Sequence, residues 1–333
     1  MGLKYRLVRE DDLPGVQRLW QEETNWGGLA EELWQRLVVQ APEWARVSGA
    51  VATDESGAIV GQFAFVPSLV AVNGREVRAF RPGAPIVSRS LRFRDAHPLN
   101  HPAVRMYNYA VKALRARGDG LIYMVPDPRW LRLFKMFPFL HCGSFPLWQL
   151  PLPLERPLTS GDGYSASRLA ALDDARIDRL WARARRLYDC QVVRDSRTLA
   201  WKLNEPGYEV VGVERGGELV GLAAGRAKGD RQWLLCDVVT ADAGDALRET
   251  LLAAVNVAHE IAHDRARERA AAGGAAKPIH KIAVLTTPLM ETALRSLGFQ
   301  RGPYDFPLVV HVLDPSLTRH DVSPSRWYVS AND

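Results

Sequence analysis

Apolar and polar positions along this chain change period at regular intervals, and each change marks an expected helix or strand. Residues 5–9 alternate as a short strand does, and Leu19 and Trp20 then lie on one face of a helix that Asp11 or Asp12 can cap. Asn73-Gly74 between two apolar runs predicts a hairpin turn. A helix should begin at or near Pro102 and end at Gly118, because Pro is tolerated in a first helical turn. Further helices are expected over 29–39, 129–137, 174–188, 197–204, 245–267 and 289–297, and strands over 49–53, 59–67, 69–72, 77–88, 121–125, 145–150, 209–214, 219–227, 233–240, 279–285 and 308–312.

The two halves of the chain repeat one another. Gly57-Ala-Ile-Val-Gly61 recurs as Gly217-Glu-Leu-Val-Gly221, about 160 positions later. Pro128 precedes Phe139 by the same interval that separates Pro288 from Phe299. Solenoid repeats have units of about 20–50 residues, so this spacing corresponds to a whole domain. The pattern predicts an N-terminal domain over residues 1–152, a proline-rich linker over 153–163 and a C-terminal domain over 164–333.

Composition narrows the class of protein. A chain of 333 residues, 47% hydrophobic and 24% charged, fits two soluble globular domains. Its apolar runs are shorter than the roughly 18 residues that a membrane span needs, and its first residues lack a signal-peptide core, so we expect a cytoplasmic protein with no membrane partner. Cys142, Cys190 and Cys236 show neither a disulfide framework nor zinc-ligand spacing.

Each half follows the order β-α-α-β-β-β-α-β-α-β, a mixed α/β layer architecture. This order, with an early Gly-x-[Ile/Leu]-Val-Gly hairpin and a late strand–Pro–helix–Gly-Phe unit, resembles the GCN5-related N-acetyltransferase (GNAT) superfamily. The layout is similar to that of tandem members, also used by Fem-type aminoacyl and N-acyl transferases, with local matches at Ala200-Trp-Lys-Leu203, Pro206-Gly-Tyr208 and residues 121–152. The resemblance implies, in each half, a mostly antiparallel twisted sheet with a central splayed parallel pair flanked by helices. It also implies acetyl-CoA or acyl-CoA as co-substrate, its pyrophosphate held at a helix N-terminus.

The sequence departs from the family in its phosphate loop, which in the family reads [Arg/Gln]-x-x-Gly-x-[Gly/Ala]. The corresponding stretch of the first half, residues 92–104, has no glycine, so arginine side chains would have to bind phosphate instead. In the second half Asp242 and Asp245 would cap the helix but repel a pyrophosphate. The donor site is therefore expected in the N-terminal half. The predicted cofactor-binding residues are Arg89, Arg92, Arg94, Ala103 and Arg105.

Candidate catalytic residues lie near this loop. His97 and His101 can titrate near neutral pH, and Asp127 follows the carboxyl end of the strand that carries Tyr123, where ligands of open α/β sheets gather. Each also has a plain structural interpretation, as a loop residue or helix cap, a turn residue, or a core residue. The tyrosine that often acts as the family's general acid is absent, because Phe134 and Leu294 occupy the two equivalent positions.

A competing motif is His259-Glu260-Ile-Ala-His263, the H-E-x-x-H pattern of zinc hydrolases. The segment runs on into a charged stretch in which Glu268 is the only nearby third ligand, at a poor spacing. We therefore expect a helix tail and no metal.

Together these features predict an acyltransferase, transferring acyl groups other than aminoacyl groups to an amine of a small molecule or polymer precursor. An acyl carrier protein or a tRNA is an alternative donor partner to free acyl-CoA. A catalytically degenerate binding or scaffold protein remains open because the glycines and tyrosines are missing. So does a Fem-like transferase that uses aminoacyl-tRNA, for which the arginines between residues 75 and 94 would be the footprint.

Overall fold

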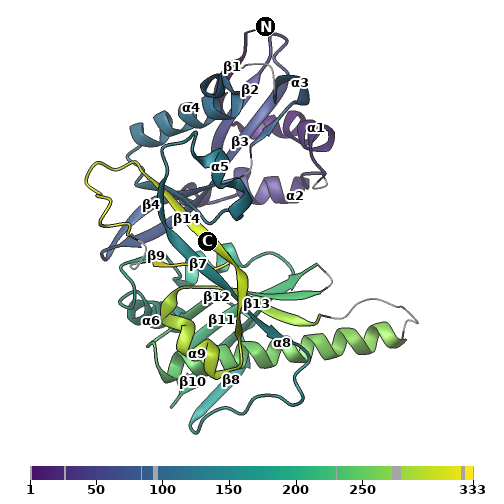
Figure 1. Ribbon diagram of the computed structural model, residues 1–333, viewed down its shortest axis with the longest axis vertical. Coiled ribbons are helices and arrows are strands. Elements are labelled where there is room, and N and C mark those ends of the chain that lie inside the picture. Colours follow the sequence, from purple (N-terminus) through teal and green to yellow (C-terminus); the bar gives the residue numbers. More distant parts are fainter. Residues whose placement is uncertain are drawn as a thin grey trace. The chain divides into compact units, whose positions relative to one another are not determined.

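The computed structural model of the chain describes residues 2–25, 28–83, 85–92, 97–229, 231–271, 279–323 and 327–332 (Figure 1). It forms two compact units, and neither is continuous in sequence. Unit 1 comprises Met1–Val70, Arg75–Gly143 and Pro307–Ser323, and unit 2 comprises Ala71–Gly74, Ser144–Phe306 and Pro324–Asp333. Each unit thus combines most of one half of the chain with a segment of the other. The domain boundaries at residues 152 and 164 stay a prediction.

Unit 1 contains a mixed sheet with the strand order β1-β2-β3-β4-β6-β14. Its strands are β1 (Lys4–Leu7), β2 (Ser48–Thr53), β3 (Ile59–Val72), β4 (Arg75–Pro82), β6 (Leu121–Met124) and the later part of β14 (Gln300–Val312), with the short β5 (Ile86–Val87) paired to β3. β4 and β6 run parallel, whereas β1, β2 and β3 pair in antiparallel fashion. The hairpin between β3 and β4 turns at Asn73 and Gly74, whose φ angles of 51° and 79° confirm the predicted turn. The two strands expected over 59–67 and 69–72 are one continuous strand.

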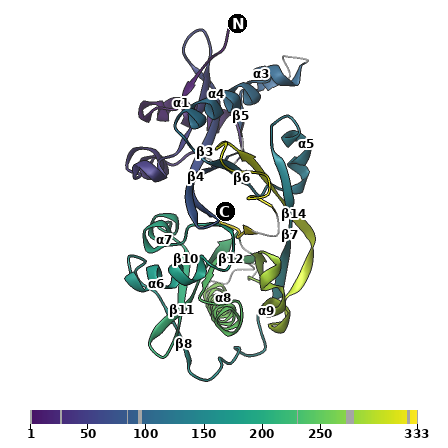
Figure 2. The same cartoon turned by 90° about the vertical axis from the view of Figure 1, so that its left-hand side faces the viewer.

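Alternation along β2 places different helices on the two faces of this sheet. Ala50 and Ala52 point into a core formed with α4 (Pro102–Ala116), whereas Val51 points into a second core formed with α1 (Leu13–Glu23). Figure 2 shows α1 and α4 with the strands of this unit. The other helical segments of unit 1 are η1 (Glu10–Asp12), α2 (Glu31–Trp34), η2 (Gln35–Val39), η3 (Glu43–Ala45), α3 (Arg89–Arg92), η4 (Pro98–Asn100), η5 (Pro128–Trp130) and α5 (Leu131–Phe134).

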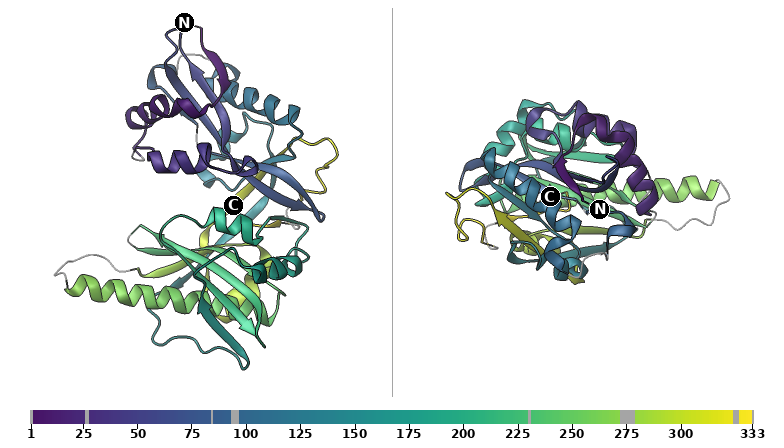
Figure 3. Two further views of the ribbon diagram at one scale, coloured as in Figure 1. Left: turned by 180° about the vertical axis from the view of Figure 1, so that it is seen from behind. Right: turned by 90° about the horizontal axis from the view of Figure 1, so that it is seen from above.

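Unit 2 repeats this plan with the strand order β7-β13-β12-β11-β10-β8. The parallel pair is β12 and β13, and the neighbouring pairs are antiparallel. The long helix α8 packs on β10, β11 and β12 and α6 on β11 and β12, on opposite faces of the sheet (Figures 2 and 3). The strands are β7 (Leu140–Pro151), β8 (Tyr164–Arg168), β10 (Tyr208–Arg215), β11 (Glu218–Lys228), β12 (Gln232–Thr240) and β13 (Lys281–Leu285), and β9 (Cys190–Val192) pairs with β15 (Trp327–Tyr328). The helical segments are α6 (Ala175–Ala184), α7 (Ser196–Lys202), α8 (Asp245–Ala271), η6 (Pro288–Met290) and α9 (Glu291–Ser296).

Strand partners are exchanged between the two halves of the chain. In unit 1, β6 pairs with β14, so that Val310 lies opposite Tyr123. In unit 2, β13 pairs with β7, so that Val284 lies opposite Trp148. The last strand of each half therefore completes the sheet that the other half begins. The expected fold class is confirmed: each unit has a mostly antiparallel sheet with a central parallel pair and helices on both faces. None of the helices in the described ranges has the length and apolar character that crossing a membrane requires.

The repeated glycine motif has the same two functions in both units. Gly57 and Gly217 adopt positive φ angles of 85° and 81° in the turn of a hairpin. The second glycine lies under a helix: a Cβ at Gly61 would stand 3.1 Å from Met106 of α4, and one at Gly221 would stand 1.7 Å from Thr250 of α8. The missing side chain therefore lets the main helix of each unit approach its sheet.

Candidate functional site

The parallel strands of unit 1 diverge near their carboxyl ends. β4 pairs with β6 only at Ala79 with Leu121 and at Phe80 with Ile122. β4 then ends at Pro82, and the chain returns as β5 to pair with β3. The next residues of β6, Tyr123 and Met124, keep their pairing with β14 on the other side. Unit 1 therefore has the splayed pair that the resemblance to the GNAT superfamily implies.

Helix α4 begins close to this splay, and its first amides are all used within the chain. Pro102 at the first helical position has no N–H. The Ala103 amide donates to Nδ1 of His101 over 3.2 Å, and the amides of Val104 and Arg105 donate to the His101 carbonyl over 2.9 and 3.2 Å. Burial lowers the pKa of His101, so the capping imidazole is neutral at pH 7. A neutral side chain thus occupies the positive end of this helix.

The predicted arginines differ in what they contact. Arg92 donates to the Val87 carbonyl over 2.8 Å and to the carbonyl and carboxylate of Glu23 over 3.0 and 3.1 Å, which ties α3 to the end of α1. Arg89 is 75% exposed and lies 3.7 Å from the same carboxylate. Arg105 donates only to the amide oxygen of Asn100, over 2.9 Å, among the described residues. Arg94 lies outside the described residues. Of the predicted arginines that the structure describes, Arg105 and Arg89 are therefore the best placed to turn toward an added anion.

The four predicted catalytic residues do not converge on one point. His97 is exposed just before η4, and His101 caps α4. Tyr123 is buried, and its hydroxyl donates to Ser68 over 3.1 Å. Asp127 accepts from the backbone and the guanidinium of Arg129, which lowers the pKa of Asp127 to about 2. Asp127 is consequently ionised and already paired at neutral pH, which suits an orienting group better than a base.

In unit 1 two buried side chains, Tyr107 and His311, form a polar cluster with the exposed Arg115, a contact that the sequence does not predict. His311 of β14 lies 2.7 Å from the Tyr107 hydroxyl through Nδ1 and 3.1 Å from the Arg115 guanidinium through Nε2. Arginine can only donate, so Nε2 accepts and the proton of the neutral ring lies on Nδ1. Burial, with the Arg115 charge, lowers the pKa of His311 to about 4. No local signal pairs His311 with Tyr107, because the residues directly before it in β14 form a plain apolar run.

The corresponding helix start in unit 2 holds a carboxylate. Asp242 accepts from the amides of Gly244 and Ala246 over 2.9 and 3.2 Å, directly before and within the first turn of α8. The negative charge satisfies the orphan amides and the helix dipole. The sequence prediction of an acidic cap is confirmed for Asp242, and this end of the helix already carries the charge that a phosphate would bring.

The splay of unit 2 is filled by the segment that follows β14. β12 pairs with β13 only as far as Leu235 with Val284. Three residues further, the amide of Val238 donates to the hydroxyl of Tyr328 over 3.0 Å. Next to it, Asp237 accepts from Arg194 over 2.8 Å. Further contacts to Asp237 come from Ser330, Asn332 and Lys202, at 3.1, 3.1 and 3.3 Å. Both Arg194 and Asp237 are 1% exposed, so this side of unit 2 is a closed, charged core.

The H-E-x-x-H segment lies within α8 and has a structural role. His259 is buried, and its Nδ1 accepts the backbone amide of Leu154 over 3.2 Å. Burial and the neighbouring His263 lower its pKa. Glu260 forms an exposed ion pair with Arg168 at 3.2 Å. Across the described ranges, no three His, Cys, Asp or Glu side chains gather as metal ligands. His259 is therefore a buried cap for the segment after β7, rather than a residue at a frayed helix end.

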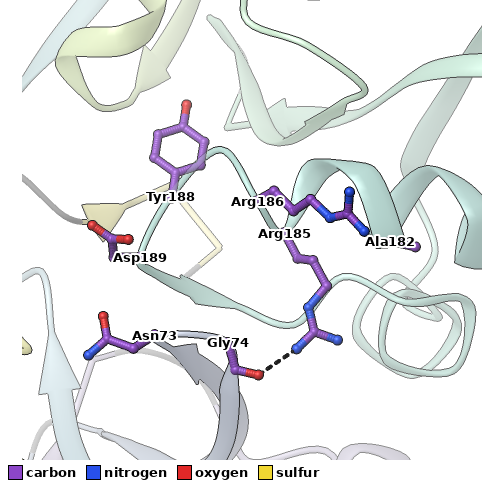
Figure 4. A pocket seen from close by; sticks show the side chains of 7 residues that line it. All are labelled: Asn73, Gly74, Ala182, Arg185, Arg186, Tyr188 and Asp189. Atoms are coloured by element: carbon purple, nitrogen blue, oxygen red, sulfur yellow. Dashed lines mark hydrogen bonds between the residues drawn. The ribbon is translucent and has the colours of Figure 1, made fainter.

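A hollow of about 550 Å³ lies at the C-terminal end of α6. Figure 4 shows Arg185 reaching the Gly74 carbonyl, over 2.8 Å, and Arg186 beside it. The Asn73 amide donates to the Asp189 carbonyl over 2.7 Å, which fixes the tip of the β3–β4 hairpin in unit 2. Cations are favourable at the end of a helix, so these arginines have a structural explanation. None of the predicted site residues lines this hollow.

Comparisons with known proteins agree on the fold. No family model and no curated protein matches the sequence. Among solved structures, a GCN5-related N-acetyltransferase from Anabaena variabilis matches with a TM-score of 0.67 at 11% identity, covering 94% of this chain and 73% of that one. Another from Kribbella flavida matches with a TM-score of 0.63 at 16% identity, covering 94% and 72%. An N-myristoyltransferase from Saccharomyces cerevisiae with bound myristoyl-CoA matches with a TM-score of 0.58 at 12% identity, covering 92% and 78%. The splayed parallel pairs and these likenesses together show that the chain has the fold of the GCN5-related N-acetyltransferases.

Proposed function

We propose that this protein is an N-acyltransferase whose acyl donor, acetyl-CoA or another phosphopantetheine thioester, binds in unit 1 between the N-terminus of α4 and the end of β6. The acceptor is an amine of a small molecule or polymer precursor. The observation that carries this proposal is the difference between the two helix caps. The corresponding position holds neutral His101 in unit 1 and anionic Asp242 in unit 2.

Charge supports unit 1 over unit 2 as the donor site. A phosphate at the start of α8 would face the Asp242 carboxylate, and like charges a few ångströms apart repel. The Tyr328 hydroxyl also already uses the Val238 amide of that splay. In unit 1 the cap is uncharged and Arg105 and Arg89 lie close in sequence, so an anion would be attracted. Both arguments favour unit 1.

The residues of unit 1 fit a phosphate better than a pyrophosphate. The donors of the first turn of α4 are used by His101, and no glycine opens the backbone. Arg105 and Arg89 would hold a phosphate by side chain, next to the small Ala103. When bound, the thioester supplies an acyl carbon: a C–N bond to the amine forms, the C–S bond breaks, one amine proton leaves to a base, and the thiolate takes up a proton.

Among the described residues, His97 is the candidate for that base. It is exposed beside the start of α4, whereas His101 is committed to its cap and Asp127 to Arg129. Tyr123 already donates its hydroxyl proton to Ser68, so its proposed role is to shape the splay rather than to protonate the thiolate. Phe134 occupies the position of the family's general-acid tyrosine and cannot donate a proton, so water would protonate the leaving thiolate.

Titration calorimetry with acetyl-CoA tests the placement of the donor. Arg105→Ala should weaken binding by about tenfold or more, the loss expected for one charge-assisted hydrogen bond. Asp242→Ala should leave the affinity unchanged, because the donor does not reach unit 2. An affinity that rises in Asp242→Ala and is unaffected in Arg105→Ala would place the donor in unit 2.

A binding protein without catalysis is the second candidate, favoured by Phe134 and by the occupied helix amides. A screen of amines with acetyl-CoA, read as release of free thiol, separates the two. Donor binding without thiol release above the rate in buffer would support the binding protein.

A further inference from the structure

We propose that the exposed face of α4 is a docking surface for an acidic carrier protein that presents its acyl group on a phosphopantetheine arm. This inference rests on the proposed function and specifies the form in which the donor arrives. The surface consists of Leu99, Arg105, Tyr109 and Lys112.

These four side chains form one continuous stripe. Arg105, Tyr109 and Lys112 follow one another at four and three residues, so they lie on the same side of α4. The Arg105–Asn100 hydrogen bond places η4, and with it Leu99, beside the first turn of the helix. Leu99 is 57% exposed and Tyr109 is 43% exposed, which makes them two of the few large apolar side chains that the described residues leave open to solvent.

The charge of the stripe is positive and not neutralised. Helix α4 contains no acidic residue along Pro102–Ala116. Lys112 is exposed and forms no ion pair within the described part of the chain, and Arg105 contacts an amide rather than a carboxylate. Such a surface suits a protein partner whose apolar residues pack on Leu99 and Tyr109 while its carboxylates pair with Arg105 and Lys112.

Nucleic acid is a poorer partner for this unit. Several of the arginines that gave the sequence its basic cluster are paired: Arg75 with Asp314, Arg78 with Asp119, and Arg92 with Glu23, whereas exposed Arg89 has only a long contact of 3.7 Å to Glu23. Binding to a tRNA draws its strength from many phosphate contacts by unpaired cations. The stripe on α4 offers two such cations, which is enough to steer a small acidic protein.

The position of the stripe explains the unusual helix start. Lys112 lies about 15 Å along the helix from Pro102, at 1.5 Å per residue, so a partner on this face would be adjacent to the splay. A carrier-bound arm brings one phosphodiester, whereas CoA brings a pyrophosphate and a further phosphate. Because His101 uses the first-turn amides, unit 1 has room for the simpler group. The docking surface would then supply the donor affinity that the family's glycine-containing phosphate loop, absent here, would otherwise provide.

The test uses the full chain and a purified acyl carrier protein in its apo, holo and acetyl-loaded forms. We expect micromolar binding of the holo form, and weakening of about tenfold or more in the double variant Tyr109→Ala/Lys112→Glu, with a steep loss in 0.5 M salt. Lys4→Glu makes the same charge change at an exposed site on β1 and should leave binding intact. Circular dichroism confirms that each variant is folded.

A transfer assay separates this inference from the proposed function. An amine is added with either acetyl-carrier or acetyl-CoA as donor, and release of free thiol measures acyl transfer. The kcat/KM for the donor should be at least about tenfold higher for acetyl-carrier than for acetyl-CoA. Equal carrier binding by wild type and the double variant, a higher kcat/KM with acetyl-CoA, or binding of tRNA in place of the carrier would each overturn the docking surface. Carrier binding that depends on the stripe, without transfer from any donor, would instead overturn the proposed function and leave the surface standing.

Discussion

Replacing Asp237 by asparagine should destabilise unit 2 far more than removing an exposed charge from the same unit. Asp237 is 1% exposed and accepts from Arg194 at 2.8 Å, with Ser330 and Asn332 as further donors. Asp237→Asn keeps the volume but removes the charge that faces a buried guanidinium. Breaking a buried ion pair by removing one partner costs about 3–5 kcal/mol, because the other charge stays desolvated.

The chain offers a matched control in the same unit. Asp305 pairs with Arg301 at 2.6 Å, but the two side chains are 40% and 52% exposed. An exposed pair of this kind contributes about 0–1 kcal/mol, so Asp305→Asn should change the free energy of unfolding very little. The same substitution is therefore expected to differ in cost by several kcal/mol between the two sites.

Urea unfolding followed by tryptophan fluorescence measures both variants. We expect a clearly lower urea midpoint for Asp237→Asn and a midpoint close to wild type for Asp305→Asn. Equal midpoints would show that the core around Asp237 is hydrated, and that the segment with Tyr328 does not close the splay of unit 2. Donor binding in unit 1 would then lose one of its two supporting arguments.

Three further predictions concern the packing and titration of single residues. Gly221→Ala should cost about 1–3 kcal/mol by overpacking against Thr250, and Gly61→Ala less, because the flexible Met106 can move; equal losses on thermal unfolding would contradict this. The folded-state pKa of His311, about 4, lies below its ordinary 6.5, so the unfolded chain takes up this proton first as the pH falls. The contribution of neutral His311 to folding stability is therefore complete above about pH 6.5 and is lost as the pH falls toward 4. That contribution is on the order of 3 kcal/mol, and His311→Gln should flatten this part of the stability–pH curve relative to wild type. His259→Leu should cost about 1–3 kcal/mol by leaving the Leu154 amide without its acceptor, whereas exposed His263→Leu should stay within about 0.5 kcal/mol; near-stoichiometric zinc by elemental analysis would reverse this interpretation.

Much of the fold could be predicted because it depends on local patterns. The limits at Pro102 and Gly118 predict α4, the Asn73-Gly74 pair predicts its hairpin, and the repeated glycine motif predicts two copies of one fold. Each is encoded by neighbours in sequence, through helical periodicity or backbone conformation. The short strands β8, β9 and β15 are not predictable in this way, because they carry too few residues for their alternation to be seen.

For the candidate site, residue types could be chosen from the sequence, but their contacts could not. The acidic cap at Asp242 follows from residue type at a helix start, and the structure contains it. His97, His101, Tyr123 and Asp127 are candidates by sequence because their side chains can transfer protons. The hydrogen bonds that three of them form, to Ala103, Ser68 and Arg129, decide how far each can do so, and those partners depend on distances that a sequence does not contain.

By itself, the sequence determined the two-fold repeat, the presence and order of most of the longer helices and strands, and the buried face of the helices with a clear apolar stripe. These properties follow from the period of apolar residues. That period indicates which face of an element is buried, but not which other element covers that face. Only the tertiary structure decided that β14 completes the sheet of unit 1 and β7 that of unit 2. It alone brought Tyr328 to the amide of Val238, and His311 to Tyr107, 204 residues away along the chain. Hydrogen bonds between strands are chemically alike, so the choice of partner is made by the packing of whole faces.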